Sequence, residues 1–324
     1  MKSAVIFLSV FRGIFMANKI WVLGDAVVDL IPDGERHYLK CAGGAPANVA
    51  VGVARLGVPS AFIGRVGKDP LGEFMQQTLK AENVNTDFMY LDPDHRTSTV
   101  VVGLDNGERS FTFMVNPSAD QFLTDSDLPP FQAGEWLHCC SIALINEPTR
   151  TATFAAMKNI KAAGGKVSFD PNLRESLWQS QAEMIDVVMQ AVALADVLKF
   201  SEEELTLLTR TDSLEKSFEK LTALYPEKLI IVTMGKDGAL FHLNGQREIV
   251  SGKALKPMDT TGAGDAFVGG LLAGLALRPD WQTNTEKLKT IIRQANACGA
   301  LACTAKGAMS ALPNQRQLAE FLTD

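Results

Sequence analysis

The stretch DTTGAGDAFVGG, Asp259 to Gly270, leads directly into an apolar segment of helical period. Gly262 and Gly264 therefore fall at a helix N-terminus, where free backbone N–H groups and the helix dipole favour an anion. Residues without a side chain also let the backbone approach a phosphate closely. The alternative interpretation is a glycine-rich N-cap, a common turn element. Asp265 would repel a phosphate unless it accepted a proton from an attacking hydroxyl, so the stretch favours phosphoryl transfer.

Two established phosphate-binding templates do not fit this chain. The pattern G-x-G-x-x-G fails because its sixth position is Phe267, which disfavours a dinucleotide-binding loop and with it a dehydrogenase. The P-loop pattern G-x-x-x-x-G-K-[ST] occurs nowhere in the sequence. An anion cradle that carries its own carboxylate remains.

A second glycine cluster, CAGGAPANVAVGVARLG, covers residues 41–57. Gly43 and Gly44 precede a predicted helix that contains Asn48, and GDAVVD places Asp25 and Asp29 around the end of the first predicted strand. A turn or capping role is the alternative for Asp29. Carboxylate and amide groups suit a ligand rich in hydroxyl donors. Together these residues predict a polar pocket for a neutral polyol.

The rest of the chain alternates short β-rich runs with longer segments of helical period, which predicts an α/β fold with a mostly parallel sheet flanked by helices. The predicted core strands are 19–25, 60–67, 135–143, 166–170, 196–201 and 229–235. The predicted helical segments are 47–57, 71–83, 149–164, 176–195, 213–225, 265–276, 285–307 and 315–324.

Two segments, 37–43 and 97–115, alternate instead like antiparallel strands, with a turn at 105–107. They predict a small β-sheet lid formed by segments at about 32–43 and 95–117. We find no linker that would divide the chain, so residues 16–324 are predicted to form a single domain.

Composition restricts the partners and the location of the protein. The chain has 324 residues, 46% of them hydrophobic, and a net charge of −6 from 31 basic and 37 acidic residues. Nucleic acid is therefore disfavoured as a partner. Its 5 cysteines show no C-x-x-C spacing, as is typical of reduced thiols in the cytosol. Residues 1–15 resemble a short signal peptide but lack a cleavage site and are too short to span a membrane. We interpret them as a disordered or spurious extension and expect a cytoplasmic protein without a membrane partner.

The two glycine clusters resemble the two signatures of the ribokinase-like sugar kinases, also called the PfkB carbohydrate kinases, from about Met16 to the C-terminus. GGAPAN is moderately specific for that family and DTTGAGD is highly specific. Within the family, GDAVVDLIPDG and GERSFTF are most similar to bacterial fructokinases. The resemblance implies a ribokinase-like fold, a β-lid over the sugar and ATP-dependent phosphorylation of the 6-hydroxyl of D-fructose.

Several alternatives stay open from the sequence. A kinase for aminoimidazole riboside, another nucleoside, ribose or 2-keto-3-deoxygluconate belongs to the same class. Ala45 and Pro46 stand where an acidic substrate would need a cationic pocket, which favours a neutral sugar. A non-catalytic sugar or nucleotide sensor on the same scaffold is disfavoured because it would not need Asp265.

The resemblance also implies residue roles. Asp265 would be the general base, with an anion hole formed by the amides of Gly262, Ala263 and Gly264. Sugar contacts would come from Asp25, Asp29, Gly43, Gly44 and Asn48, with Arg109 and Phe113 closing over the sugar. Arg174, for which a surface salt bridge is the alternative, would contact substrate or phosphate. ATP would be bound by Lys199, Thr233, Gly235, Gly238, Ala263, Gly264 and Asn296.

The same resemblance implies metal sites and an assembly. Glu204 would organise Mg²⁺ through water, although Ser201 replaces the asparagine that family members often carry there. A monovalent cation, expected to be K⁺, would be bound by Asp259, Thr261 and the backbone of Ala302, Ala305, Gly307 and Ser310. A homodimer formed through the lid is also expected.

Overall fold

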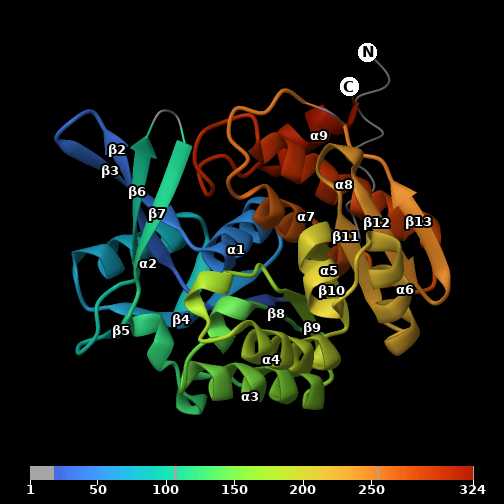
Figure 1. Ribbon diagram of the computed structural model, residues 1–324, viewed down its shortest axis with the longest axis horizontal. Helices are drawn as coiled ribbons and strands as arrows, with labels where there is room; N and C mark the ends of the chain where they lie inside the picture. Colours follow the sequence, from blue (N-terminus) through green and yellow to red (C-terminus); the bar gives the residue numbers. More distant parts are fainter. Residues whose placement is uncertain (1–17, 106–107, 254, 324) are drawn as a thin grey trace.

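A computed structural model describes residues 18–105, 108–253 and 255–323 (Figure 1). It confirms the predicted fold class, with a mostly parallel central sheet between helices and a separate small sheet. The predicted N-terminal extension, residues 1–15, and positions 106–107 of the predicted lid turn lie outside the described residues.

The central sheet has 9 strands in the order β13-β12-β11-β10-β9-β8-β1-β4-β5. All neighbouring strands pair in parallel except β11 with β12 and β12 with β13. The strands are β1 Ile20–Leu23, β4 Ser60–Gly67, β5 Val84–Asp92, β8 Trp136–Cys140, β9 Lys166–Asp170, β10 Val197–Ser201, β11 Leu229–Thr233, β12 Ala239–Leu243 and β13 Gln246–Val250. Central strands such as β1 and β8 are buried along their whole length, which explains their continuous apolar runs.

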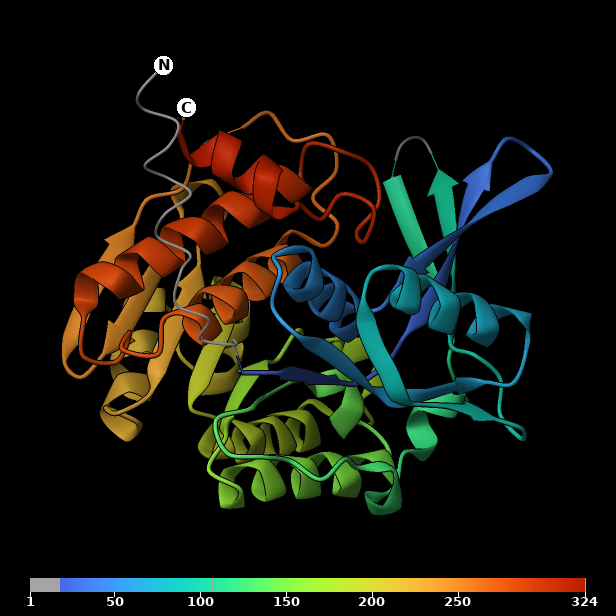
Figure 2. The ribbon, with the colours of Figure 1, turned by 180° about the vertical axis from the view of Figure 1, so that it is seen from behind.

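Helices cover both faces of this sheet, and alternate strand residues face each layer. Ile20 and Val22 pack with α1 Ala45–Arg55, α2 Pro70–Ala81, α7 Ala263–Leu277, α8 Thr285–Ala302 and α9 Gln315–Thr323. Trp21 and Leu23 pack with α3 Thr149–Ala162, α4 Gln181–Leu194, α5 Glu202–Thr209 and α6 Leu214–Leu224. Figure 2 shows these layers above and below the sheet.

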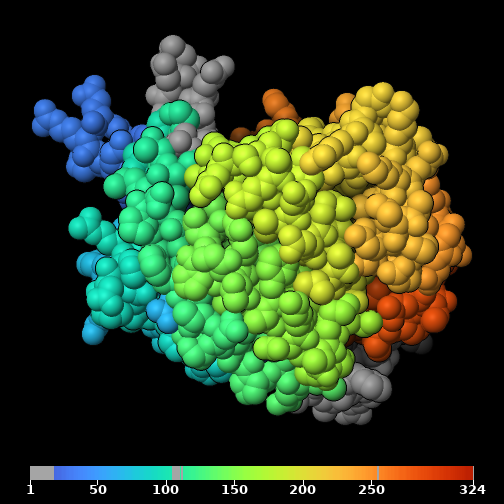
Figure 3. All heavy atoms as spheres, turned by 60° about the horizontal axis from the view of Figure 1, so that its bottom comes forward, coloured from blue at the N-terminus to red at the C-terminus, as the bar shows by residue number. Residues whose placement is uncertain are grey.

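The small sheet has 4 strands in the order β3-β2-β6-β7, namely β2 Val27–Asp33, β3 His37–Gly43, β6 Thr99–Asp105 and β7 Glu108–Met114. Its β2–β3 hairpin stands out from the body of the molecule (Figure 3). The sequence placed the start of the first lid segment at about residue 32, which is wrong, because β2 already pairs with β3 from Val27. Val27 and Val28 are buried, so their apolar character does not mark where the core strand ends and the lid begins.

Helices α1 and α7 cross at two glycines. A Cβ on Gly269 would lie 3.3 Å from the Cα of Gly52, which is tight, whereas a Cβ on Gly52 would lie 3.6 Å from the Cα of Gly269, an ordinary contact. The missing side chains let the two backbones lie close together. The crossing brings the two glycine-rich signatures of the sequence together, although they lie more than 200 residues apart.

Two further elements were not predicted from the sequence, and one helix begins later than predicted. Strand β5 was not predicted, because this edge strand alternates polar and buried residues without a strong β-rich run. Helix α5 was missed, and α4 begins at Gln181 rather than Ser176 because Ser180 caps it by accepting a hydrogen bond from the Glu183 amide. Short 3₁₀ turns lie at η1 Ala119–Phe122, η2 Asp125–Asp127, η3 Ser141–Leu144, η4 Glu175–Leu177 and η5 Gly235–Asp237. Among the described residues, no helix combines the length and apolar character needed to cross a membrane.

Candidate active site

A cavity of about 590 Å³ lies between the small sheet and the carboxyl ends of central strands. This is the edge at which open α/β sheets bind their ligands. Many of the predicted site residues line it, from segments spread over the whole chain. They are Asp25, Asp29, Gly44, Asn48, Phe113, Arg174, Lys199, Thr261, Gly262, Gly264 and Asp265.

Asp265 lies in the first turn of α7, as predicted, and Gly262 is the N-cap with φ +78°. The Nδ2 atom of Asn48, on α1, donates a hydrogen bond of 2.8 Å to the Oδ2 atom of Asp265. Burial raises the pKa of Asp265, while the Asn48 hydrogen bond and the charges of Lys199 and Arg174 lower it. A carboxylate in this environment can stay ionised and still be a better proton acceptor than one in water.

One end of the cavity is acidic. Asp25 follows β1, and burial raises its pKa to about 7, with the nearby Asp120 carboxylate adding to the rise. Asp29 lies on β2 of the small sheet rather than at the end of the first core strand, and burial raises its pKa to about 6. A Cβ on Gly43 would lie 2.3 Å from the Oδ2 atom of Asp29, so this glycine makes room for the carboxylate.

Two cationic side chains also line the cavity, Lys199 and Arg174. The Nζ atom of Lys199, at the end of β10, lies 3.0 Å from Oδ2 of Asp170, at the end of β9, and both side chains are buried. The same ammonium group lies close to Gly264, because a Cβ there would be 3.4 Å from Nζ. Arg174 is exposed, and its guanidinium donates to its own loop at Asn172 and Leu173 rather than forming the surface salt bridge considered as an alternative.

The lid contributes Phe113, whose side chain is 37% exposed and lines the cavity. Arg109 lies on the same strand, β7, but its side chain is outside the described part of the structure. Its proposed role in closing over the sugar therefore stays a prediction.

Of the residues predicted to bind the nucleotide, Lys199 and Gly264 line the cavity, whereas Thr233, Gly235, Gly238, Ala263 and Asn296 are not part of its lining. Thr233 ends β11 and donates to the Phe200 carbonyl, and Gly235 and Gly238 follow in the turn with positive φ. A Cβ on Gly238 would lie 2.1 Å from the carbonyl oxygen of Val250, and Asn296 of α8 donates to that same oxygen over 2.9 Å. The structure thus brings Gly238 and Asn296 to one backbone segment.

Glu204 caps the start of α5. Its Oε2 atom accepts from the Ser201 amide and its Oε1 atom accepts from the Leu173 amide, each over 2.8 Å. No group of three or more His, Cys, Asp or Glu side chains suited to a metal occurs among the described residues. A carboxylate held in this way fits the outer shell of a hydrated Mg²⁺ better than direct coordination.

The loop predicted to bind a monovalent cation folds against Asp259. The Oδ2 atom of Asp259 accepts from the Gly307 amide over 3.1 Å, and Oδ1 accepts from the hydroxyl of Thr261 over 2.7 Å. Ser310 donates instead to the carbonyl of Lys306 over 2.9 Å. Ala302 ends α8 and Ala305 is exposed in the loop that follows. Carboxylate, hydroxyl and carbonyl oxygens form a donor set that suits a hard monovalent cation.

Several polar residues that line the cavity were not predicted. Asp170 ends the predicted strand 166–170, so its position at the carboxyl end of a parallel strand could have indicated it. Asp120 lies in the 3₁₀ turn η1 and gives no comparable signal. The other unpredicted polar lining residues are Ser98, Asn116, Gln121, Asn146, Asn172 and Gln179.

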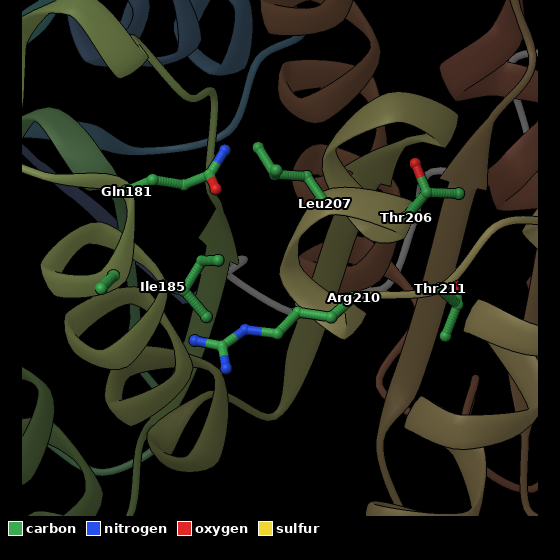
Figure 4. Close-up of a pocket in the computed structure, with 7 residues that line it drawn as sticks. Gln181, Ile185, Thr206, Leu207, Arg210 and Thr211 are labelled. Carbon is green, nitrogen blue, oxygen red and sulfur yellow. The ribbon is translucent and has the colours of Figure 1, made fainter.

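A second cavity, of about 490 Å³, lies between α4 and α5 (Figure 4). Arg210 extends its side chain across the space between the two helices, and Gln181, Ile185 and Leu207 complete the wall. None of the predicted site residues lines it.

Comparisons with known proteins show the family of the chain. The family described as pfkB family carbohydrate kinase matches residues 17–315. A fructokinase from Vibrio alginolyticus is 56% identical over 306 residues, which cover 94% of this chain and 99% of that protein. The aminoimidazole riboside kinase of Salmonella typhimurium is 43% identical over 314 residues, covering 94% of this chain and 95% of that protein.

A solved structure extends the likeness to three dimensions. The fructokinase double mutant from Vibrio cholerae O395, crystallised with fructose, ADP and a potassium ion, superposes with a TM-score of 0.90 at 59% identity. The match covers 95% of this chain and 99% of that chain. Because the family pattern and full-length relatives both cover nearly the whole sequence, this chain belongs to the pfkB family of carbohydrate kinases.

Proposed function

We propose that this protein is a fructokinase, which transfers the γ-phosphoryl group of ATP to the 6-hydroxyl of D-fructose and releases fructose 6-phosphate and ADP. The observation that carries the proposal is the position of Asp265. It lies at the N-terminus of α7, in a cavity lined by both acidic and cationic side chains, and accepts a hydrogen bond from Asn48. Fructokinases at 52–56% identity over nearly the whole chain support fructose over aminoimidazole riboside, whose kinase is 43% identical.

The geometry accounts for each part of the reaction. The sugar hydroxyl that attacks the phosphoryl group gives its proton to the carboxylate of Asp265. The amides at the start of α7, those of Ala263 and Gly264 among them, would stabilise the charge on the transferring group. In this structure the Ala263 amide donates to the carbonyl of Thr260 over 3.2 Å, so it must turn from that partner to the phosphoryl group. Lys199, beside Gly264, places a positive charge at the same end of the cavity. The cavity thus offers groups suited to a neutral polyol and groups suited to a phosphate.

Two ions complete the proposal. Mg²⁺ would neutralise the phosphate charge when bound, with Glu204 holding one of its water molecules. K⁺ would be bound beside the anion hole by Asp259, Thr261 and the 302–310 loop. The hydrogen bond from Gly307 to Asp259 supports this site, because it closes the loop against the start of α7.

The test of the function is the variant Asp265→Asn. Its amide cannot accept the proton, so kcat should fall by about 10³-fold or more while fructose still binds. The assay couples ADP release to a spectroscopic readout and compares fructose, ribose, glucose, aminoimidazole riboside and 2-keto-3-deoxygluconate. Near wild-type turnover by Asp265→Asn, or preferred turnover of aminoimidazole riboside by the wild type, would contradict the proposal.

The lid is also proposed to form a homodimer. Strands β3 and β7 are the edges of the small sheet, and they expose Tyr38 and Leu39, each at 56%, and Met114 at 61%. Unpaired edges with exposed apolar side chains favour pairing with a second copy. Light scattering should give a dimer for the wild type and a monomer for Leu39→Glu, whereas a monomeric wild type would refute the assembly. A cytoplasmic location stays a prediction from the sequence.

A further inference from the structure

The sugar end of the cavity holds buried acceptors without a donor. Among the described residues, the buried side-chain atoms that lack a hydrogen-bond partner include Oδ1 of Asp25, Oδ1 of Asn48 and Oδ1 of Asp120, and all three residues line the cavity. Asn48 uses its amide group to donate to Asp265, so its free atom is an acceptor. Buried polar groups rarely stay unsatisfied in native proteins. Three unsatisfied acceptors therefore indicate a ligand that brings several donors, as a polyol does.

Asp120 lies in a turn that several hydrogen bonds hold in place, and its own carboxylate accepts from Ser118 and from its backbone amide. The amide of Ala119 donates to the carbonyl of Arg96, which lies before β6, over 2.8 Å. The hydroxyl of Ser118 donates to the carbonyl of Val115, which follows β7, over 2.8 Å. The backbone carbonyl of Asp120 accepts from the hydroxyl of Thr149, on α3, over 2.8 Å. The turn η1 thus fixes Asp120 to both ends of the lid and to the core, and the Oδ1 atom of its carboxylate, which has no partner, is available to the cavity.

The carboxylates of Asp120 and Asp25 carry like charges and repel each other. Burial raises the pKa of Asp120 to about 6, and its charge contributes to the raised pKa of Asp25. The positive charge of Arg174 lowers the pKa of Asp25, whereas the negative charge of Asp265 raises it further. Two carboxylates that are desolvated side by side cost free energy unless a ligand supplies donors to both. A neutral sugar relieves this cost, whereas an anionic sugar would increase it.

We propose that Asp120 is a sugar-binding residue that accepts a hydroxyl of the acceptor sugar together with Asp25, and so selects neutral polyols over sugar acids and sugar phosphates. The inference rests on the proposed function, because it names the group that recognises the sugar of that reaction. It adds Asp120, from the turn η1 that follows the lid strand β7, to a site otherwise built by β1, β2, α1 and α7.

The first experiment measures fructose binding directly, by calorimetry on the full chain without nucleotide. Hydrogen bonds to charged groups are worth enough that Asp120→Asn should raise the Kd for fructose about tenfold to a hundredfold. The matched control is Asp127→Asn. Asp127 lies in the neighbouring turn η2, where its carboxylate accepts from Arg65 over 3.0 Å, and it does not line the cavity. This variant should melt at a lower temperature and bind fructose within about twofold of the wild type.

Folding of the variant is checked in the same samples. Because Asp120→Asn removes repulsion with Asp25, it should melt no lower than the wild type at pH 8. If it does not fold, Asp120→Ser also removes the carboxylate and has a smaller side chain. An unchanged Kd for fructose in a folded Asp120 variant would overturn the inference.

A second experiment identifies the hydroxyl that Asp120 accepts. Four sugars keep the 6-hydroxyl but each lack one other, namely 1-deoxyfructose, 2,5-anhydromannitol, 3-deoxyfructose and 4-deoxyfructose. For the sugar that lacks the bonded hydroxyl, the wild type and Asp120→Asn should show the same Kd, because neither complex contains the bond. If the variant weakens binding of fructose and of all four analogues equally, Asp120 acts on the fold and the inference fails.

These measurements also separate the inference from the proposed function. Fructose binding that depends on Asp120, without fructose-dependent ADP release, would refute the kinase proposal and support the inference. ADP release with fructose, combined with an Asp120 variant of wild-type Kd, would refute the inference alone. A wild-type protein that does not bind fructose would refute both.

Discussion

Gly44 lies between Asp25 and Asn48, two of the proposed sugar contacts, so a substitution there should disturb the sugar site. It is the N-cap of α1, with φ +94° and ψ +122°, a conformation that residues with a side chain rarely adopt. A Cβ here would lie 2.8 Å from the carbonyl oxygen of Asp25 and 3.1 Å from the amide nitrogen of Val27. The backbone amide of Asn48 donates to the Gly44 carbonyl over 2.9 Å. Gly44→Ala should therefore displace Asp25 or Asn48.

The expected cost has two parts. Holding alanine in this conformation costs about 1–3 kcal/mol, and the overlap with backbone atoms costs about 1–3 kcal/mol more. At about 2 °C per kcal/mol, toward the lower end for large domains, Gly44→Ala should lower the melting temperature by about 4–12 °C. Because the displaced groups are the proposed sugar contacts, the KM for fructose should rise about tenfold or more while the KM for ATP changes little.

The control is Gly34→Ala, in the turn between β2 and β3. Gly34 also has a positive φ, +76°, but nothing lies within 4 Å of a Cβ placed there. It should lose only about 1–2 kcal/mol, or about 2–4 °C, and keep its KM for fructose. Thermal melting and steady-state kinetics on the three proteins test the difference. If both variants melt within about 1 °C of each other, or if Gly44→Ala keeps the wild-type KM, the close approach at Gly44 does not shape the sugar site.

Three further predictions concern charge. Burial raises the pKa of Asp25 to about 7, so the contribution of this group to stability falls as the pH rises from about 4 to about 7. Asp25→Asn should therefore melt at a higher temperature than the wild type at pH 8 and lose this gain near pH 4. Lys199→Met should lower the free energy of unfolding by about 3–5 kcal/mol in urea, because Asp170 is left buried without its partner, and adding Asp170→Asn should restore part of it. Asp259→Ala should abolish any preference of kcat and of the melting temperature for K⁺ over Na⁺, and an undiminished K⁺ effect would contradict the proposed cation site.

The sequence predicts this fold well where local signals are strong. The strands Ser60–Gly67 and Lys166–Asp170 have the predicted bounds, because each is a buried β-rich run between turn residues. The position of Asp265 in the first turn of α7 also follows from the glycines before it. The edge strand β5 shows the limit, since a half-exposed strand lacks the continuous apolar run of a central one.

The geometry of the site depends on contacts that no local pattern encodes. The hydrogen bond between Asn48 and Asp265 joins residues 217 positions apart and exists because α1 and α7 cross. Asp120 lies in a short 3₁₀ turn whose sequence, ADQF, has no periodicity, and only the packing of the lid junction directs it to the cavity. Glu204 was predicted from its motif, but its two backbone hydrogen bonds became apparent only in the folded chain.

The glycine crossing of α1 and α7 has a consequence for how such an enzyme can acquire a new acceptor. With no side chains between Gly52 and Gly269, the helices cannot slide or separate without opening a void at their closest approach. A side chain that pushed the two helices apart would therefore be expected to lengthen the hydrogen bond from Asn48 to Asp265. Asp29, Phe113 and Asp120 lie outside this crossing, so we expect changes of the acceptor sugar to arise around them with the base left in place.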